Sequence, residues 1–149
     1  MIRFDTENFA GVREEIAPLI EAHYEEVALH RDAVKLAPDW GRYRHAEQTR
    51  SLAVYTARDA DKLVGYSVFL LSYHLHYVHT LVAANDVLYL DPQYRKGSAG
   101  IKLIKHSEED LRDRGVDRIL WHVKCGHDFR AILHRLGYTD EETIVGKLL

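Results

Sequence analysis

Apolar residues recur along the chain at two spacings, one typical of helices and one typical of strands. Between residues 16 and 27 they follow the helical spacing, with glutamates largely outside that stripe. Pro18 suits a first helical turn, so we expect this helix to start near Glu15. Pro38 interrupts the chain before a second short helix, which is predicted over residues 40–49. Both helices precede the main run of strands.

The longest apolar run, Val64–Leu71, is nearly continuous, as in a strand that is buried on both faces. It lies in the second strand of a predicted hairpin, formed by residues 51–58 and 62–75. The other predicted strands cover residues 2–4, 80–90, 117–124 and 143–149, and the other helices cover residues 99–114 and 127–136. The order β-α-α-β-β-β-α-β-α-β predicts one mixed sheet with helices on its faces.

Composition narrows the class of protein further. With 149 residues, the chain is expected to form a single domain over residues 1–149. A net charge of −3 gives no overall positive field for nucleic acid, although contact through a local patch stays open. The single Cys125 excludes a disulfide within the chain and suits a reducing compartment. The acidic N-terminal segment is unlike a signal peptide, and no apolar run has membrane-spanning length, so we expect a soluble cytoplasmic protein.

The clearest sign of a binding site lies in the loop between the strand over residues 80–90 and the helix from residue 99. The strand stops at Asp91-Pro92, and the basic and small residues Arg95-Lys96-Gly97-Ser98-Ala99-Gly100 follow. Backbone N–H groups at a helix N-terminus, together with the helix dipole, favour phosphate. A phosphate-bearing cofactor is therefore the expected ligand, and the alternative is an ordinary strand-to-helix turn.

This segment resembles the acetyl-CoA motif of the Gcn5-related N-acetyltransferases (the GNAT family), a strand followed by Arg/Gln-x-x-Gly-x-Gly/Ala and a helix. Ser98 stands where the first glycine is usual; serine is small and can still donate to phosphate, but its backbone is less permissive. Leu136-Gly137-Tyr138, after a strand and a helix, also resembles the family, so the resemblance covers nearly the whole chain. It implies an α/β (α+β) fold with a mixed, largely antiparallel sheet of six to seven strands, flanked by about four helices.

A narrower resemblance rests on His74-Leu75-His76-Tyr77 ahead of Asp86–Leu90. This pattern is similar to a branch of small acetyltransferase-like proteins that are common in phages and prophages.

The family resemblance implies direct transfer of an acetyl group from acetyl-CoA to an acceptor amine, without a covalent enzyme intermediate. The pantetheine arm is expected along the backbone of Leu88, Tyr89 and Leu90, where a backbone N–H polarises the thioester carbonyl. The pyrophosphate is expected on the loop amides, with the charge of Arg95 beside them. These amides belong to Lys96, Gly97, Ser98, Ala99 and Gly100.

Asp86 is the candidate proton acceptor, because many relatives carry a carboxylate on this strand facing the acceptor. On a regular strand it shares a face with Leu88 and Leu90, which predicts a buried carboxylate with a raised pKa. The alternative is a strand-end aspartate held by backbone N–H groups.

The proton donor for the leaving thiolate cannot be carried over from the family. Relatives often use a tyrosine four residues before the glycine that ends the last helix, and that position is Leu133 here. Water, His127 or His134 would have to serve instead. Each histidine could equally be a capping or surface residue.

Three of the ten histidines lie in the segment His74-Leu75-His76-Tyr77-Val78-His79. On a strand, His74 and His76 project from the same face, so they could act as base and orienter for an incoming amine or as two metal ligands. No cysteine or carboxylate lies at a matching ligand spacing, so no metal site is predicted. A polar strand end stacked on Tyr73 and Tyr77 is the structural alternative.

The acceptor is not defined by the sequence. Aromatic and basic residues interleave between residues 24 and 45, the region that usually shapes the acceptor site in this family. They suit an anionic or aromatic acceptor, or simply a second amphipathic helix packed on the sheet. Three hypotheses follow: an N-acetyltransferase for a small amine or a protein amino group, a degenerate fold that binds CoA or a partner without turnover, and an acyltransferase for a nucleobase or another phage-related macromolecule. A homodimer is compatible with all three.

Overall fold

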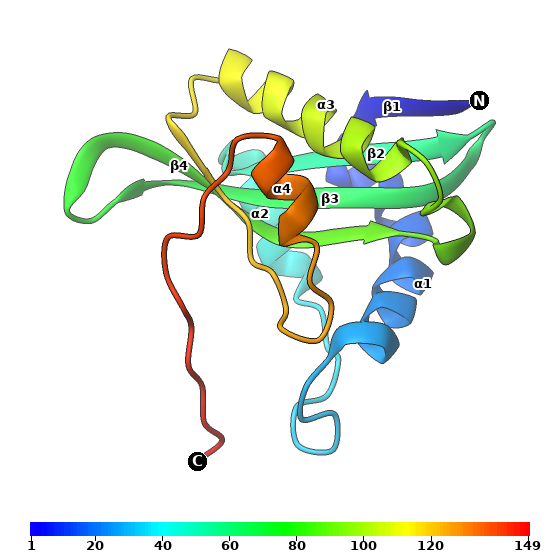
Figure 1. Cartoon of the computed structure of the whole chain (residues 1–149), viewed down its shortest axis with the longest axis horizontal. Coiled ribbons are helices and arrows are strands. Elements are labelled where there is room, and N and C mark those ends of the chain that lie inside the picture. Colours follow the sequence, from blue (N-terminus) through cyan, green and yellow to red (C-terminus); the bar gives the residue numbers. More distant parts are fainter.

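The computed structural model describes all 149 residues, which form one five-stranded sheet with helices on both faces (Figure 1). The strands, in sheet order, are β1 (Ile2–Thr6), β2 (Leu52–Asp59), β3 (Lys62–His74), β4 (Tyr77–Leu90) and β5 (Arg118–Leu120). The helices are α1 (Phe9–Val27), α2 (Trp40–Gln48), α3 (Ala99–Asp113) and α4 (Arg130–Arg135), with a 3₁₀ turn η1 (Pro92–Tyr94). Strands β1 to β4 are antiparallel, and β5 runs parallel to β4.

Two buried clusters show which helices cover each face of the sheet. On one face, Phe9 and Ile16 of α1 pack against strand residues such as Tyr66, and α2 packs on the same cluster. On the other face, Leu103 of α3 packs against strand residues such as Phe69. Helices α1 and α3 therefore lie on opposite sides of the sheet (Figure 1). None of the helices combines the length and apolar composition needed to cross a membrane.

The sheet has five strands, so the prediction of six to seven strands is wrong. The strand predicted over residues 117–124 is reduced to Arg118–Leu120, and the strand predicted over residues 143–149 does not form. In the first case the apolar alternation reflects aromatic packing beyond the pairing region: the Trp121 ring lies 5.0 Å from the Phe69 ring, centroid to centroid.

The C-terminal segment has no strand partner because the residues before it are held elsewhere. Tyr138 donates from Oη to Glu108 of α3 at 3.1 Å, and Asp140 contacts His134 of α4 at 2.8 Å. The chain then runs away from the sheet (Figure 1). Ile144 and Val145 are consequently 76% and 90% exposed.

Helix α1 begins at Phe9 rather than near Glu15, and Pro18 lies in its middle. Tertiary contacts outweigh the preference of proline for a first turn. The Glu47 carboxylate of α2 accepts hydrogen bonds from the Phe9 and Ala10 backbone N–H groups, which caps the start of the helix. Pro18 is exposed, so its ring faces solvent rather than the sheet. The other predicted elements lie within a few residues of their observed bounds.

A buried arginine joins α1 to β2. Arg58 is 8% exposed, and its guanidinium donates to both carboxylate oxygens of Glu7 and of Glu15 at 2.8–3.3 Å. These hydrogen bonds lower the pKa of both glutamates below the usual value of 4.5. The three charges fix the N-terminal half of α1 on the sheet.

Candidate active site

Strand β4 is irregular at Asp86. Val87 pairs with Val68 of β3, but the next pair along the strand joins Asn85 to Phe69, so Asp86 has no partner on β3. This is a β-bulge, in which one extra residue on one strand locally breaks the alternation of side chains between the two faces.

The bulge determines which way Asp86 faces. Tyr43 of α2 donates from Oη to Asp86 Oδ2 at 2.8 Å, and Val87 packs in the cluster under α1. Leu88 and Leu90 pack with the cluster on the α3 face instead. The expectation that Asp86 shares a face with Leu88 and Leu90 is therefore wrong. The expectation of a buried carboxylate is also wrong, because Asp86 is exposed.

A buried asparagine holds the bulge in place. Asn85 is 2% exposed, and its Nδ2 donates to the carbonyl oxygen of Val87 at 2.9 Å and to that of Val68 at 3.2 Å. The amide thus ties both ends of the irregular stretch together. Sequence reasoning missed this residue, although a polar side chain inside an apolar strand was an available signal.

The outer edge of β4 is unpaired over its C-terminal half. Strand β5 pairs only with Val82, Ala83 and Ala84, whereas residues 86–90 have a neighbouring strand on the β3 side alone. An unpaired edge offers N–H and C=O groups to an extended ligand that carries amides of its own. The pantetheine arm of acetyl-CoA carries two amides, so the edge at Leu88, Tyr89 and Leu90 fits it, with the Leu90 carbonyl already accepting from Arg95 Nε.

The loop before α3 presents free backbone donors. The first N–H of this segment to bond within the helix is that of Lys102, which donates to the Ser98 carbonyl at 2.9 Å. The N–H groups of residues 96–101 donate no hydrogen bond within the chain. Gly97 has φ +96°, a conformation that favours glycine, and the Ser98 side chain makes no capping bond. These donors, at the positive end of a 15-residue helix, fit a pyrophosphate.

Arg95 links this loop to α1 through an ion pair. Its guanidinium donates to both carboxylate oxygens of Glu26 at 2.5 and 2.6 Å, and Nε donates to the Leu90 carbonyl at 2.7 Å. Its Cζ lies 5.7 Å from the centre of the Tyr89 ring. The Arg95 hydrogen bonds lower the pKa of Glu26, and His127 Nδ1 lies 3.6 Å from the same carboxylate. Much of the Arg95 charge is therefore already paired within the chain.

A cavity of about 310 Å³ opens on the α1 and α2 side of the bulge. We call it the Asp86 cavity. It is lined by Ile20, His23, Tyr24, Val34, Lys35, Leu36, Ala37, Pro38, Tyr43, Tyr66, Asp86 and Val87. The hydroxyl of Tyr66 is buried and has no hydrogen-bond partner within the chain, and burial raises its pKa. Burial and the neighbouring Asp86 likewise raise the pKa of Tyr43.

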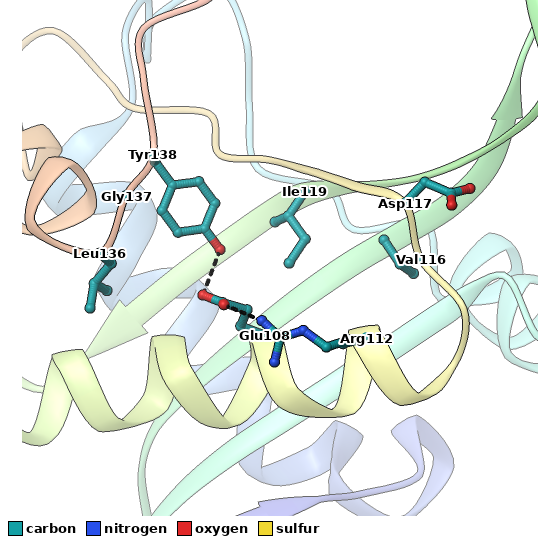
Figure 2. A pocket seen from close by; sticks show the side chains of 8 residues that line it. All are labelled: Glu108, Arg112, Val116, Asp117, Ile119, Leu136, Gly137 and Tyr138. Atoms are coloured by element: carbon teal, nitrogen blue, oxygen red, sulfur yellow. Dashed lines mark hydrogen bonds and ion pairs between the residues drawn. The ribbon is translucent and has the colours of Figure 1, made fainter.

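A second cavity, of about 260 Å³, lies between α3 and the chain on either side of α4 (Figure 2). Figure 2 shows the Tyr138 hydroxyl pointing at Glu108, which also pairs with Arg112 at 2.6 Å. The Glu108 carboxylate therefore already has two hydrogen-bond partners within the chain. The cavity lies on the face opposite the Asp86 carboxylate, so it takes no part in the candidate active site.

The structure separates the two histidines from Asp86. His74 ends β3, and His76 lies in the two-residue turn with Leu75, so the pair does not share a regular strand face. Asp86 is roughly 20 Å away along the hairpin, six residues from His74 on the β3 side. The His74 ring lies 4.8 Å from the Tyr77 ring, centroid to centroid, at an interplanar angle of 34°. The described chain contains no group of three or more residues that could hold a metal ion.

The helix position that would carry the usual proton donor is apolar and buried. Leu133 is 4% exposed. His134 is paired with Asp140 at the C-terminal side of α4. His127 is the one of the two candidate histidines that lies beside the Arg95–Glu26 pair, next to the loop before α3.

A protein-family model described as the acetyltransferase (GNAT) family matches residues 14–138. The chain therefore belongs to the GNAT acetyltransferase family and is an acyltransferase, and acetyl-CoA is the acetyl donor of this family. No curated protein sequence matches the chain.

Solved structures share the fold at low sequence identity. An aminoglycoside acetyltransferase from an uncultured soil metagenomic sample superposes with a TM-score of 0.75 at 16% identity, covering 99% of this chain and 95% of its own. A ribosomal-protein-alanine N-acetyltransferase from Brucella melitensis gives 0.72 at 16% identity, covering 99% of each chain. An acetyltransferase from Clostridium acetobutylicum, with acetyl-CoA, gives 0.73 at 8% identity, covering 99% and 96%. None of them is described as a phage protein.

Proposed function

We propose that the protein transfers the acetyl group of acetyl-CoA directly to a primary amine held in the Asp86 cavity, with Asp86 as the proton acceptor. The bulge in β4 is the observation that carries the proposal. It turns a carboxylate toward a cavity on one side of the strand, while the edge of the same strand stays free for the donor.

The donor would lie along the free edge of β4 at Leu88–Leu90, with its pyrophosphate on the N–H groups of residues 96–101. Acetyl-CoA supplies an activated acetyl thioester there. The strand edge and the helix N-terminus orient it, and both consist of rigid backbone rather than mobile side chains.

Asp86 is equipped to hold and deprotonate the amine. Tyr43 occupies Oδ2, and Oδ1 accepts no hydrogen bond within the chain, so it is available to an ammonium group. The bound ammonium group first gives one proton to Asp86, which passes it to water. The neutral nitrogen then attacks the acetyl carbonyl and the C–N bond forms, the nitrogen gives its second proton to Asp86, the C–S bond breaks, and the thiolate leaves. The thiolate gains its proton from solvent or from His127, and Asp86 returns its proton to water.

A second candidate function is CoA binding without turnover. It is favoured by Leu133, which places a buried apolar side chain where relatives often carry the proton-donating tyrosine. A thiolate can still leave with a proton from water, so this observation alone does not exclude catalysis.

Two measurements test these functions in turn. Thermal shift with acetyl-CoA, and separately with CoA, should stabilise the protein, because ligands that bind only the folded state raise its melting temperature. No stabilisation by either compound contradicts both candidate functions. Release of free thiol from acetyl-CoA in the presence of amines then supports transfer, and its absence across a broad amine panel supports binding alone.

Substrate details and cellular context are further predictions. The aminoglycoside and ribosomal-protein acetyltransferases among the structural relatives act on very different amines, so their names do not select an acceptor. The cytoplasmic location, the homodimer and the phage-type branch stay predictions from the sequence.

A further inference from the structure

The walls of the Asp86 cavity are mainly apolar. Ile20 and Tyr24 of α1 form one side, and Val34 and Leu36 of the segment before α2 form another. Val87 of β4 lies beside Asp86 in the lining. A volume of about 310 Å³ is at the small end of ligand pockets, so the cavity suits a compact molecule with an apolar body.

The cavity carries little charge. Asp86 is the only carboxylate in its lining, and Lys35 is the only lysine or arginine. Burial lowers the pKa of His23, so that ring is neutral near pH 7. One carboxylate complements one ammonium group, whereas a polyamine or an amino sugar with several ammonium groups would leave charges unpaired against apolar walls.

The polar groups of the cavity gather at one end. The Tyr43 hydroxyl donates to Asp86, and the Tyr66 hydroxyl is buried beside them without a partner in the chain. A buried hydroxyl without a partner is costly unless a ligand or water completes it. The cavity therefore has a polar end around Asp86, and the rest of its lining is mainly apolar. This distribution matches a ligand with an amine at one end and an apolar body.

The side of the cavity formed by the segment before α2 is held in place without a ligand. Tyr24 donates from Oη to the Val34 carbonyl at 2.8 Å, and Arg31 pairs with Glu25 at 2.6 Å, so the segment before α2 is tied to α1. A wall held in this way loses little further freedom when a ligand binds.

We propose that the acceptor is a small monoamine on an aromatic or aliphatic body, bound with its ammonium group at Asp86 and its body between α1 and residues 34–38. This rests on the proposed function, because it names the substrate class of the same site.

The first test compares amines with single and multiple charges. Acetyl-CoA consumption should be about 100-fold more efficient in kcat/KM with 2-phenylethylamine or tryptamine than with spermidine or glucosamine 6-phosphate, because only the first two bury an apolar body. A preference for spermidine or glucosamine 6-phosphate overturns the acceptor class while the proposed function stands. Consumption with none of the amines counts against the proposed function.

Binding provides a readout that does not need turnover. Saturation-transfer NMR should show tryptamine contacting the protein, and Leu36→Asp should weaken this binding and raise the tryptamine KM about 10-fold, because a charge replaces an apolar wall. Leu29→Asp is the matched control, since Leu29 is an exposed leucine outside the cavity. Equal effects of the two substitutions, or no tryptamine binding, would overturn the proposal.

A second variant tests the polar end. Tyr66→Phe removes the unpartnered hydroxyl, so it should raise the tryptamine KM several-fold while leaving the KM for acetyl-CoA unchanged. A higher melting temperature with an unchanged tryptamine KM would mean that the hydroxyl takes no part in binding the acceptor.

Discussion

The two sides of β4 offer different chemical groups to a ligand. Toward the loop before α3, the chain offers backbone: an unpaired strand edge and the free N–H groups of residues 96–101. Toward α1 and α2 it offers side chains, chiefly the Asp86 carboxylate, Tyr43 and apolar walls. Backbone groups recognise a donor that is common to a whole family, while side chains can change the acceptor without disturbing the strand. In the proposed site, the same strand thus separates donor binding from acceptor choice.

The largest expected effect comes from Asp86→Asn, which should separate the two sides most clearly. Loss of a positioned general base lowers the transfer rate by about 10²–10⁴-fold. The dissociation constant for acetyl-CoA, measured by calorimetry, should not change, because the donor side is built from backbone. Asp61→Asn, an exposed aspartate in the β2–β3 turn, is the control. Full activity in Asp86→Asn would remove Asp86 from the mechanism.

Arg58→Ala should loosen the acceptor side by freeing α1 from β2. The substitution leaves two carboxylates, Glu7 and Glu15, without their shared partner, so we expect a loss of about 3 kcal/mol in the free energy of unfolding. Chemical denaturation measures it, with the exposed Arg13→Ala as control. A change no larger than that of the control would show that the cluster does not anchor the helix.

Gly97→Ala tests the donor side. A side chain at φ +96° strains the loop, and realigning its N–H groups should weaken acetyl-CoA binding about 10-fold. Gly126→Ala adds the same methyl group at a glycine without positive φ and with no atom within 4 Å of the new carbon. Similar affinities in the two variants would argue against the loop as the phosphate site.

Glu26→Gln gives the smallest effect and carries a pH dependence. Because Arg95 lowers the folded-state pKa of Glu26 from 4.5, the pair stabilises the fold above that value, and the contribution disappears as the pH falls through the folded-state pKa. Both side chains are partly exposed, so the loss should be about 0.5–1 kcal/mol at pH 7. Denaturation at pH 7 and at pH 4 should show the difference from wild type shrinking, with Glu21→Gln as the control. A pH-independent difference would contradict the ion-pair explanation.

The backbone of the proposed donor side was predictable from the sequence because its signals are local, and the binding of acetyl-CoA there stays a prediction. Gly97, Ser98 and Gly100 follow a strand and open a helix, and the free N–H groups come from that order alone. The hairpin of β2 and β3, whose second strand holds the continuous apolar run, was likewise predicted and lies close to its predicted bounds.

The acceptor side was not predictable because long-range contacts create it. The face on which Asp86 lies depends on a bulge that Asn85 stabilises through contacts with β3, and a strict alternation rule gives the opposite face. The cavity joins α1, residues 34–38 and two strands, so no single segment marks it. The missing C-terminal strand has a similar cause, because apolar alternation in residues 143–149 says nothing about whether a partner edge is within reach.

The short pairing between β4 and β5 also has a consequence for local unfolding of the sheet. Hairpin strands β2, β3 and β4 are joined by two-residue turns, whereas β5 meets β4 at only three residue pairs after the long connection of residues 91–117. Short loops close at little entropic cost, so the hairpins form early and separate last. Detachment of β5 is then the lowest-energy local unfolding, and amide hydrogens there should exchange before those of β3. We therefore expect the native sheet to open first at the strand beside the proposed donor edge.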